Sequence, residues 1–270
     1  MKMDRTEEKH QRLLNILRSY GGILVAFSGG TDSAYLLAAA REALGDSLLA
    51  VTAGSPVHGD QEVMEAEKLA REIGVEHRVI KTHELDDPDF RMNPPDRCYI
   101  CKKGLLRVLK EIARKENLAV VVEGTNQDDL GDYRPGRKAV LEMGVLSPLL
   151  EAGLTKAEIR TLSKKIGLST WDRPTFSCFA TRIPYGEELT PERLGRVARA
   201  EEILREKGFS LFRVRDHGGI ARIEIPKADL ERAFKPDMRL SITTGLKALG
   251  FKFVTLDLEG FRSGSMNDLI

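Results

Sequence analysis

Short apolar runs alternate with amphipathic segments from the N-terminus to about residue 167. Runs with the length of buried strands occupy residues 22–27, 47–54, 76–82 and 118–126. Segments with apolar residues at helical spacing occupy residues 4–20, 34–45, 59–74, roughly 103–116, and 155–167. Because strands and helices alternate, the pattern predicts an α/β fold with a doubly wound parallel sheet and helices on both faces.

The pattern changes after about Tyr185. Thr190 and Pro191 are typical of a helix start and predict a helix over 190–208. Residues 211–225 alternate apolar and polar side chains around a Gly-Gly pair, which is typical of a hairpin, and 251–258 reads as a further strand. We therefore predict two domains, residues 1–184 and a smaller α+β domain over residues 185–270.

Composition and charge narrow the class of protein. The chain is 41% hydrophobic and 31% charged, as in ordinary globular proteins. A formal net charge of +1 gives no overall attraction to nucleic acid or to a membrane surface. No apolar run reaches the ~18 residues that a membrane span needs, and the N-terminus lacks the core of a signal peptide. We therefore expect a cytoplasmic protein with reduced thiols.

The segment AFSGGTDSAYLL joins the first predicted strand to the helix that follows it. Gly29 and Gly30 allow a tight turn and a close approach of the backbone to an anion, which the start of a helix also attracts. Ser28 and Ser33 add hydroxyl donors, and Asp32 is a candidate magnesium ligand. The segment is neither a Walker A loop nor a G-x-G-x-x-G motif.

Two more strands end in polar segments, VTAGS and EGTNQDD. Open parallel sheets bind ligands at the carboxyl ends of their strands. We therefore expect Gly124 and Thr125 to line a ligand site. Asp128 is a second candidate magnesium ligand, although an acidic pair with Asp129 is also typical of a solvated turn.

The chain has three cysteines, Cys98 and Cys101 in a C-x-x-C and the distant Cys178. In a reducing compartment, cysteines bind metal or act in catalysis more often than they form structural disulfides. A zinc site needs a fourth ligand such as His83, and no second C-x-x-C supplies one. The basic neighbours Arg97, Lys102, Lys103 and Arg182 suit thiolates. The residues alone leave zinc and a redox pair open.

Arg213 and Arg215 alternate with apolar residues and are therefore expected on one face of a strand. Two guanidinium groups on one face suit a phosphate, and the alternative is a solvated polar face. Glu201 and Glu224 are weak candidates for a metal of unknown identity. His217, beside two glycines, reads as a turn residue.

The S-G-G-x-D-S segment after the first strand resembles the PP-loop ATPases, which have the fold of the adenine nucleotide alpha hydrolases. These enzymes adenylate a substrate and release pyrophosphate. The resemblance implies that VTAGS, with Thr52, meets the adenine. It also implies that the phosphates of ATP are held by Ser28, Gly29, Gly30, Asp32 and Ser33.

A narrower resemblance covers about residues 10 to 260. The segments NPPDRCYICK, EGTNQDDLGDYRPGRKA, SPLLEAGLTKAEIRTLSKKIGL, WDRPTFSCFATRIPYGEELT and RVRDHGGIARIE together resemble the LarE sulfurtransferases. These enzymes act in making the nickel-pincer cofactor of lactate racemase. With ATP they activate the carboxylates of a pyridinium dicarboxylic acid mononucleotide and exchange oxygen for sulfur.

This resemblance implies the cofactors, partners and roles of the two domains. Residues 1–184 would bind ATP and magnesium and carry the cysteine site. Residues 185–270 would bind substrate and form subunit contacts, with Arg213 and Arg215 on the substrate phosphate near a subunit junction. Sulfide or a sulfur donor protein would be a partner, nucleic acid and membranes would not, and the assembly would be a homo-hexamer.

The family offers two uses for the cysteines. In one form, a residue matching Cys178 gives up its own sulfur and becomes dehydroalanine. In the other, three cysteines, here Cys98, Cys101 and Cys178, hold a [4Fe–4S] cluster whose open iron carries sulfide, and we favour this form. A tRNA-thiolating PP-loop enzyme is the main rival, but the chain lacks the spare cysteines and the basic excess expected of it. A glutamine-dependent synthetase and a non-catalytic nucleotide-binding module are weaker alternatives.

Overall fold

The computed structural model describes residues 5–131, 135–173, 177–262 and 264–269. The chain divides into two compact units. Unit 1 consists of Met1–His83 and Asp96–Phe176, and unit 2 consists of Glu84–Pro95 and Ser177–Ile270. No helix in the described part of the chain is long and apolar enough to cross a bilayer.

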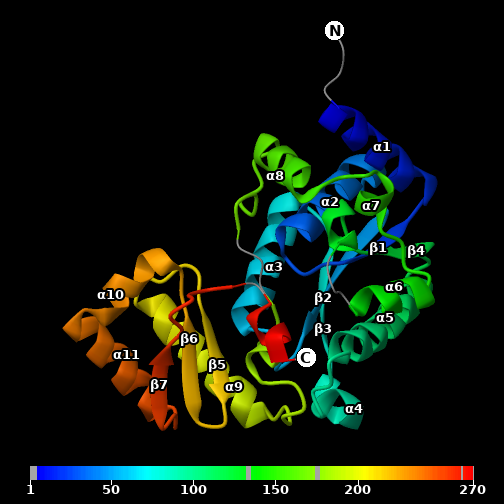
Figure 1. Ribbon diagram of the computed structural model, residues 1–270. Helices are drawn as coiled ribbons and strands as arrows, with labels where there is room; N and C mark the ends of the chain where they lie inside the picture. The colour runs from blue at the N-terminus through cyan, green and yellow to red at the C-terminus, as the bar shows by residue number, and fades with distance from the viewer. Residues whose placement is uncertain (1–4, 132–134, 174–176, 263, 270) are drawn as a thin grey trace. The chain divides into compact units, whose positions relative to one another are not determined.

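Unit 1 is built on a four-stranded sheet in the order β3-β2-β1-β4 (Figure 1). All neighbouring strands in it run parallel. Each strand lies within one of the runs predicted from the sequence, although the last strand is much shorter than its run. The strands are β1 (Ile23–Ala26), β2 (Leu48–Gly54), β3 (His77–Lys81) and β4 (Val120–Val122).

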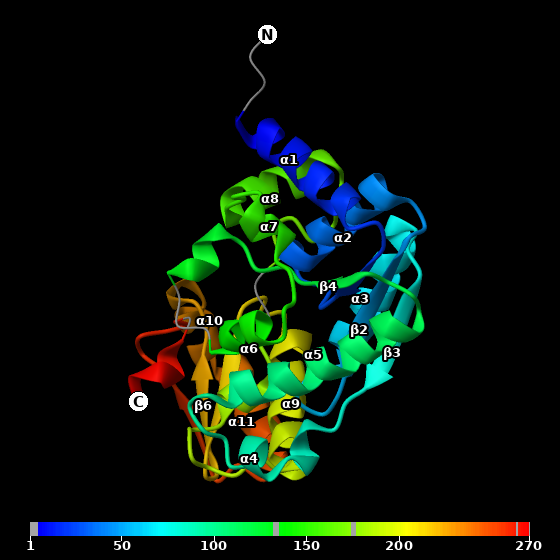
Figure 2. The same ribbon diagram turned by 90° about the vertical axis from the view of Figure 1, so that its right-hand side faces the viewer.

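Helices cover both faces of this sheet. Successive residues of a strand point to opposite sides, so both faces present apolar side chains that the helices bury. Ile23 and Val25 belong to one apolar core, and Leu24 belongs to the other. The second core is closed by α5 (Arg97–Lys115) and α6 (Gly136–Glu142), which lie side by side (Figure 2). The first core is closed by α1 (Arg5–Ser19), α2 (Thr31–Leu44), α3 (Asp60–Ile73), α7 (Pro148–Glu151) and α8 (Lys156–Lys165). The prediction of a doubly wound α/β fold is confirmed.

The helix α5 begins earlier than the predicted residue 103. It starts at Arg97, so Cys98 and Cys101 lie in its first turns. The apolar spacing that marks a helix starts only with Leu105 and Leu106. The earlier turns are held by α6, because the Tyr99 hydroxyl and the Lys103 ammonium group both reach Glu142.

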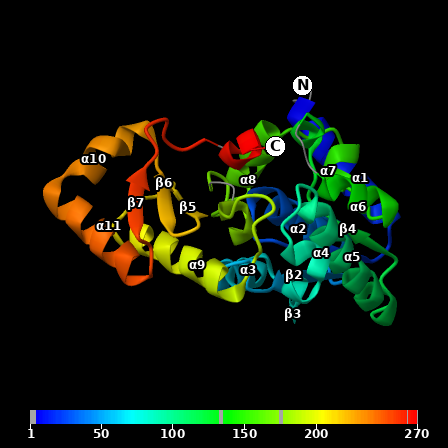
Figure 3. The ribbon, with the colours of Figure 1, turned by 60° about the horizontal axis from the view of Figure 1, so that its bottom comes forward.

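Unit 2 contains a three-stranded sheet in the order β5-β6-β7 (Figure 3). β5 (Arg213–His217) and β6 (Ile220–Glu224) form the predicted hairpin, and β7 (Phe253–Leu256) runs parallel to β6. The helices α9 (Pro191–Glu206) and α11 (Pro236–Ala248) pack on one face of the sheet around a separate apolar core. The short elements are η1 (Glu84–Asp86), α4 (Pro88–Arg91), η3 (Phe179–Arg182), η4 (Lys227–Asp229), α10 (Leu230–Phe234) and η5 (Ser265–Leu269), and unit 1 adds η2 (Gln127–Leu130).

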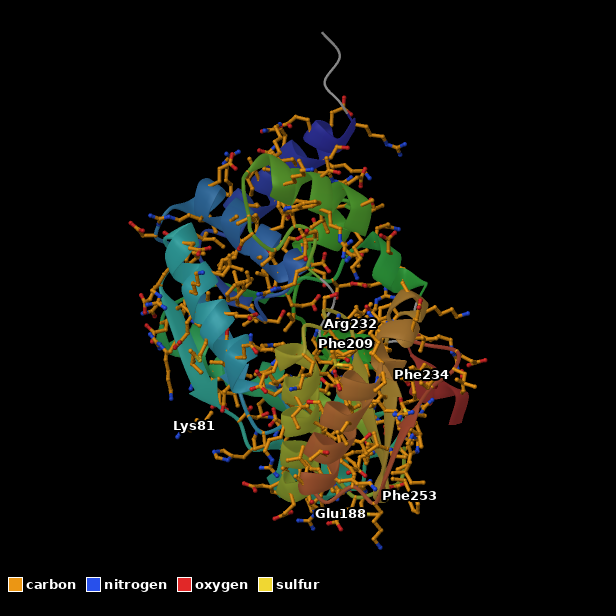
Figure 4. All side chains as sticks on the ribbon, turned by 90° about the vertical axis from the view of Figure 1, so that its left-hand side faces the viewer. Lys81, Glu188, Phe209, Arg232, Phe234 and Phe253 are labelled. Atoms are coloured by element: carbon orange, nitrogen blue, oxygen red, sulfur yellow. The ribbon has the colours of Figure 1, made fainter. Side chains whose placement is uncertain are left out.

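An arginine of α10, Arg232, caps the C-terminal end of α9. The guanidinium of Arg232 lies 4.3 Å from the centre of the Phe209 ring, and the two residues lie together in Figure 4. It also donates to the backbone carbonyls of Lys207 and Gly208, where α9 has ended. These contacts satisfy carbonyls that a helix end leaves open.

The units do not follow the predicted boundary between residues 184 and 185. Unit 2 begins at Ser177 and also includes the detached segment Glu84–Pro95. Asn93 explains this arrangement, because its buried side-chain amide donates to the carbonyls of Ile183 (3.2 Å) and Pro184 (2.7 Å). These bonds join residues far apart in sequence, and no local pattern announces them.

Candidate active site

The predicted phosphate loop follows β1 and leads into α2. Gly29 has φ +71°, and a Cβ there would lie 3.1 Å from the Cβ of Ala66, so the position requires glycine. The hydroxyl of Ser33 donates to the Gly30 carbonyl (3.1 Å) and accepts from the Ser28 amide (3.3 Å). The loop is thus folded onto the start of a helix, where backbone amides and the helix dipole favour an anion.

A second predicted nucleotide segment lies directly against this loop. A Cβ on Gly124 would be 3.1 Å from the backbone nitrogen of Ser33. The contact is with main-chain atoms at the start of α2, which have little freedom to move away. The structure therefore brings Gly124 and the phosphate loop together, as the sequence predicted from the carboxyl ends of parallel strands.

Thr52 has its hydroxyl committed within the sheet. The hydroxyl donates to the carbonyl of Phe27 (2.7 Å) and lies 2.7 Å from Nε2 of His77. Because the hydroxyl proton goes to Phe27, Nε2 of His77 must carry a proton and donate to Thr52. Burial lowers the pKa of His77 and favours this neutral form. The predicted adenine contact of Thr52 stays a prediction.

Glu123 connects the nucleotide segment to the cysteine helix. Its buried carboxylate accepts from the backbone amide of Thr125 (3.0 Å), the hydroxyl of Ser147 (2.7 Å) and Nζ of Lys102 (2.7 Å). Burial opposes ionisation, but the charge of Lys102 and the hydrogen bonds prevail and hold the pKa of Glu123 below its ordinary value. Lys102 follows Cys101 directly on α5, so this ion pair anchors the C-x-x-C helix.

The candidate magnesium ligands have different surroundings. Asp32 is half-buried in the first turn of α2, next to the phosphate loop. Asp128 is exposed, and its carboxylate accepts from the backbone amide of Lys156 (2.7 Å) at the start of α8. Within the described part of each unit, no three His, Cys, Asp or Glu side chains are grouped to hold a metal ion.

The cysteines divide between the units. Cys98 is exposed and Cys101 is half-buried, and residues three apart on a helix share a face. A Cβ on Gly136 would lie 3.4 Å from the Cys98 carbonyl and 3.3 Å from Cδ of Lys102, which shows how closely α6 packs here. Cys178 belongs to unit 2, and none of the three forms a disulfide.

Cys178 begins a tight turn, η3, that is held by a buried arginine. The carbonyl of Cys178 accepts from the hydroxyl of Thr181 (2.8 Å) and from Nη1 of Arg182 (3.1 Å). Arg182 as a whole is 1% exposed. Its Nε and Nη2 donate to the two carboxylate oxygens of Glu201 (2.8 and 3.0 Å), so a buried ion pair supports the turn.

The predicted arginines of β5 are both buried. Arg215 donates to both carboxylate oxygens of Glu224 (3.1 and 2.7 Å), which also accept from Ser265 and Arg222. Arg213 lies over the ring of Phe261 (5.2 Å). Burial, and then the positive charge of Arg182, lower the pKa of Arg213 to about 10. The face is therefore not solvated, and its phosphate role stays a prediction.

Glu201 and Glu224 bind arginines rather than forming an acidic group. Each carboxylate makes a two-point contact with one guanidinium, Arg182 and Arg215 respectively. Such paired bonds compensate the cost of burying both charges. The sequence indicated the arginines but not these partners.

Sequence reasoning missed Glu123, Ser147 and Thr181. For Glu123 a signal exists, because a lone glutamate closes an apolar strand, where an unpaired charge would be costly. Nothing local marks Ser147 or Thr181, whose partners are distant or depend on the turn.

Comparisons with known proteins support the resemblance of the phosphate loop to that of the PP-loop enzymes. A family model for asparagine synthase matches residues 16–94, which include it. A pyridinium-3,5-bisthiocarboxylic acid mononucleotide synthase of Lactiplantibacillus plantarum is 39% identical over 97% of this chain and 95% of its own. The chain belongs to the LarE family of PP-loop enzymes. An uncharacterised protein of Synechocystis is 40% identical over 98% of each chain, and one of Methanocaldococcus jannaschii is 32% identical over 89% of this chain and 91% of its own.

Family membership confirms the resemblance read from the sequence and the PP-loop fold. The three-cysteine form of the family, the roles of individual residues and the assembly stay predictions.

Proposed function

We propose that this protein is an ATP-dependent sulfurtransferase acting on a pyridinium dicarboxylic acid mononucleotide. It would form a thiocarboxylate, AMP and pyrophosphate, in the assembly of the nickel-pincer cofactor of lactate racemase. The observation that carries this proposal is the 39% identity to the Lactiplantibacillus plantarum synthase over nearly the full length of both chains. Homo-hexamer formation is part of the proposal.

The chemistry requires activation of a carboxylate, which is a poor electrophile. A carboxylate oxygen attacks the α-phosphorus of ATP, and pyrophosphate leaves. Hydrosulfide then attacks the acyl carbon, and AMP leaves with the former carboxylate oxygen. The phosphate loop supports the first step, because Ser28, Gly29, Gly30 and Ser33 lie at the start of a helix, where backbone amides and the helix dipole favour an anion.

Magnesium and the adenosine have candidate positions in unit 1. Asp32 fits a magnesium site, because it is a half-buried carboxylate beside the anion-binding loop. Asp128 fits less well, because its carboxylate already caps α8. We assign the nucleotide to Gly124 and Thr125, since Gly124 packs against the phosphate loop, and we assign the adenine to the Thr52 segment.

We assign the substrate phosphate to Arg213 and Arg215. Support comes from charge, because Arg182, Arg213 and Arg215 lie close together in unit 2 with the carboxylates of Glu201 and Glu224. Three guanidinium groups in one place suit a phosphate, which guanidinium groups can bind through two parallel hydrogen bonds.

We assign the sulfur site to Cys98, Cys101 and Cys178. Thiolates are the usual ligands of a [4Fe–4S] cluster, and the C-x-x-C offers two on one helix face. Such a cluster, when bound by three cysteines, has an iron without a protein ligand, which can hold sulfide. The alternative is sacrifice of the Cys178 sulfur.

The test supplies the protein with ATP, magnesium, sulfide and either the pyridinium dicarboxylate mononucleotide or unmodified tRNA. We expect AMP, pyrophosphate and a thiocarboxylate from the mononucleotide only. Sulfur incorporation into tRNA alone would contradict the proposal. For the sulfur site, protein purified without oxygen should be brown and contain iron. A colourless active protein that loses the mass of one H₂S in a single turnover would instead support sacrifice.

A further inference from the structure

Arg182 makes an unusual set of contacts for a buried side chain. One edge of its guanidinium binds both carboxylate oxygens of Glu201. Its Nη1 lies within hydrogen-bond distance of four oxygens of the Cys178 turn. These are the carbonyl of Ser177 (2.7 Å), the hydroxyl of Ser177 (2.7 Å), the carbonyl of Cys178 (3.1 Å) and the hydroxyl of Thr181 (2.8 Å).

These contacts fix the backbone that carries the Cys178 thiol. The Cys178 carbonyl also accepts from the backbone amide of Thr181 (3.1 Å) and from its hydroxyl (2.8 Å). η3 is only one short turn and cannot hold itself as a long helix does. The position of the thiol therefore depends on Arg182.

The same network holds the strand that carries the proposed phosphate ligands. Oε1 of Glu201 accepts from the backbone amide of Val214 (3.1 Å), which lies between Arg213 and Arg215. In the other direction, Nη1 of Arg215 donates to the carbonyl of Thr181 (2.9 Å). The Cys178 turn and β5 are thus joined at two points, through Glu201 and through Arg215.

We propose that Arg182 is a positioning residue for sulfur transfer, which holds the Cys178 turn at a fixed distance from Arg213 and Arg215. This inference rests on the proposed function, in which these arginines hold the substrate phosphate. Binding the phosphate would then place the activated carboxylate relative to Cys178. Lysine cannot replace Arg182, because a single ammonium group cannot bind both Glu201 oxygens and the turn together.

The test compares Arg182→Lys with Arg196→Lys. Arg196 lies on α9, as Glu201 does, and pairs with Asp216 on β5, but in the described part of the chain this pair forms no hydrogen bond or ion pair with the Cys178 turn. Two quantities are measured on the full chain. The first is the ratio of thiocarboxylate formed to pyrophosphate released. The second is the rate of Cys178 alkylation by iodoacetamide without added iron, followed by peptide mass spectrometry relative to Cys98.

We expect Arg182→Lys to lower the thiocarboxylate-to-pyrophosphate ratio by about tenfold to a hundredfold, because a misplacement of ~1 Å has costs of this size. We also expect the Cys178 alkylation rate to change at least ~3-fold relative to Cys98, whereas Arg196→Lys leaves both quantities near those of the wild type. Wild-type values of both quantities in folded Arg182→Lys would overturn the inference.

If Arg182→Lys does not fold, Thr181→Val carries the test. This change removes one hydroxyl that joins Arg182 to the Cys178 carbonyl, and we expect a smaller change of the same two quantities. No change in either would overturn the inference. Failure of the proposed function is distinguishable, because the wild type would then release no pyrophosphate with the mononucleotide, while the alkylation comparison needs no substrate.

Discussion

The two parts of the cysteine set are held in different ways. Cys98 and Cys101 lie on a long helix, α5, which supplies its own backbone geometry and is anchored by the Lys102–Glu123 pair. Cys178 lies on one short turn that is held by the Arg182–Glu201 pair. The Lys102 side chain is 34% exposed, whereas those of Arg182 and Glu201 are 2% and 5% exposed. We conclude that the Cys178 turn depends more strongly on a single buried ion pair.

The largest expected effect comes from the cysteines themselves. We predict that Cys98→Ser, Cys101→Ser and Cys178→Ser each abolish thiocarboxylate formation and iron binding, while ATP binding persists because the phosphate loop is a separate element. Iron content, product mass and nucleotide affinity check this. The cluster would be excluded if Cys98→Ser and Cys101→Ser stay active while Cys178→Ser does not, and if the wild type carries dehydroalanine at position 178 after turnover. Only Cys178 would then take part in sulfur transfer.

The next effect concerns the pair that holds the Cys178 turn. Glu201→Gln leaves Arg182 buried without its counterion and beside two more arginines. We expect the free energy of unfolding to fall by ~3–5 kcal/mol, as for other broken buried pairs. Urea unfolding of the full chain measures it. Glu202→Gln, one residue later on the same helix but half-exposed, is the control. Equal urea midpoints for both variants would contradict the comparison.

A smaller effect is expected at the pair that holds α5. Glu123→Gln keeps the side-chain shape but leaves one fewer acceptor for Thr125, Ser147 and Lys102, so we expect a loss of ~1–3 kcal/mol. Because the folded pKa of Glu123 is lowered, its contribution is present above the unfolded pKa of ~4.3 and is lost as the pH falls through the folded value. Urea midpoints from pH 7 downward should therefore fall less steeply in the variant than in the wild type.

The smallest expected effect is a difference between two half-buried histidines in how much each contributes to the pH dependence of stability. Burial lowers the pKa of both His77 and His217, so each stabilises the fold above its unfolded pKa of ~6.5 and loses this effect as the pH falls through the lower folded pKa. Nε2 of His217 also accepts from Arg222 (3.2 Å), and protonation would remove this bond and add repulsion.

We therefore expect His217→Gln to reduce the loss of stability between about pH 7 and pH 5 more than His77→Gln does. Thermal midpoints over this range measure the difference. A steeper effect of His77→Gln would show that desolvation, rather than the Arg222 contact, dominates.

The fold could be predicted where local pattern determines it. Apolar runs and helical spacing gave the strands and helices around the phosphate loop, and Thr190 with Pro191 gave the start of α9. The early start of α5 and the detached segment Glu84–Pro95 were missed, because tertiary contacts with α6 and the Asn93 hydrogen bonds determine them.

The site could be predicted only where a motif carries the chemistry. Gly124 was expected in the same crevice as the phosphate loop, since strand ends meet at one edge of a parallel sheet, and it lies against the backbone of Ser33; its nucleotide role stays a prediction. The partners of buried charges were not, because Glu123 finds Lys102 and Glu201 finds Arg182 across distances in sequence that no periodicity encodes.

The most direct test of the central claim follows the oxygen that leaves the substrate. The mononucleotide is prepared with ¹⁸O in its carboxylates and converted with ATP, magnesium and sulfide. Adenylation followed by attack of sulfur predicts one ¹⁸O in the AMP for each thiocarboxylate formed, and none in pyrophosphate. If thiocarboxylate is formed but ¹⁸O appears in inorganic phosphate, or in neither AMP nor pyrophosphate, activation of the carboxylate as an adenylate would be contradicted.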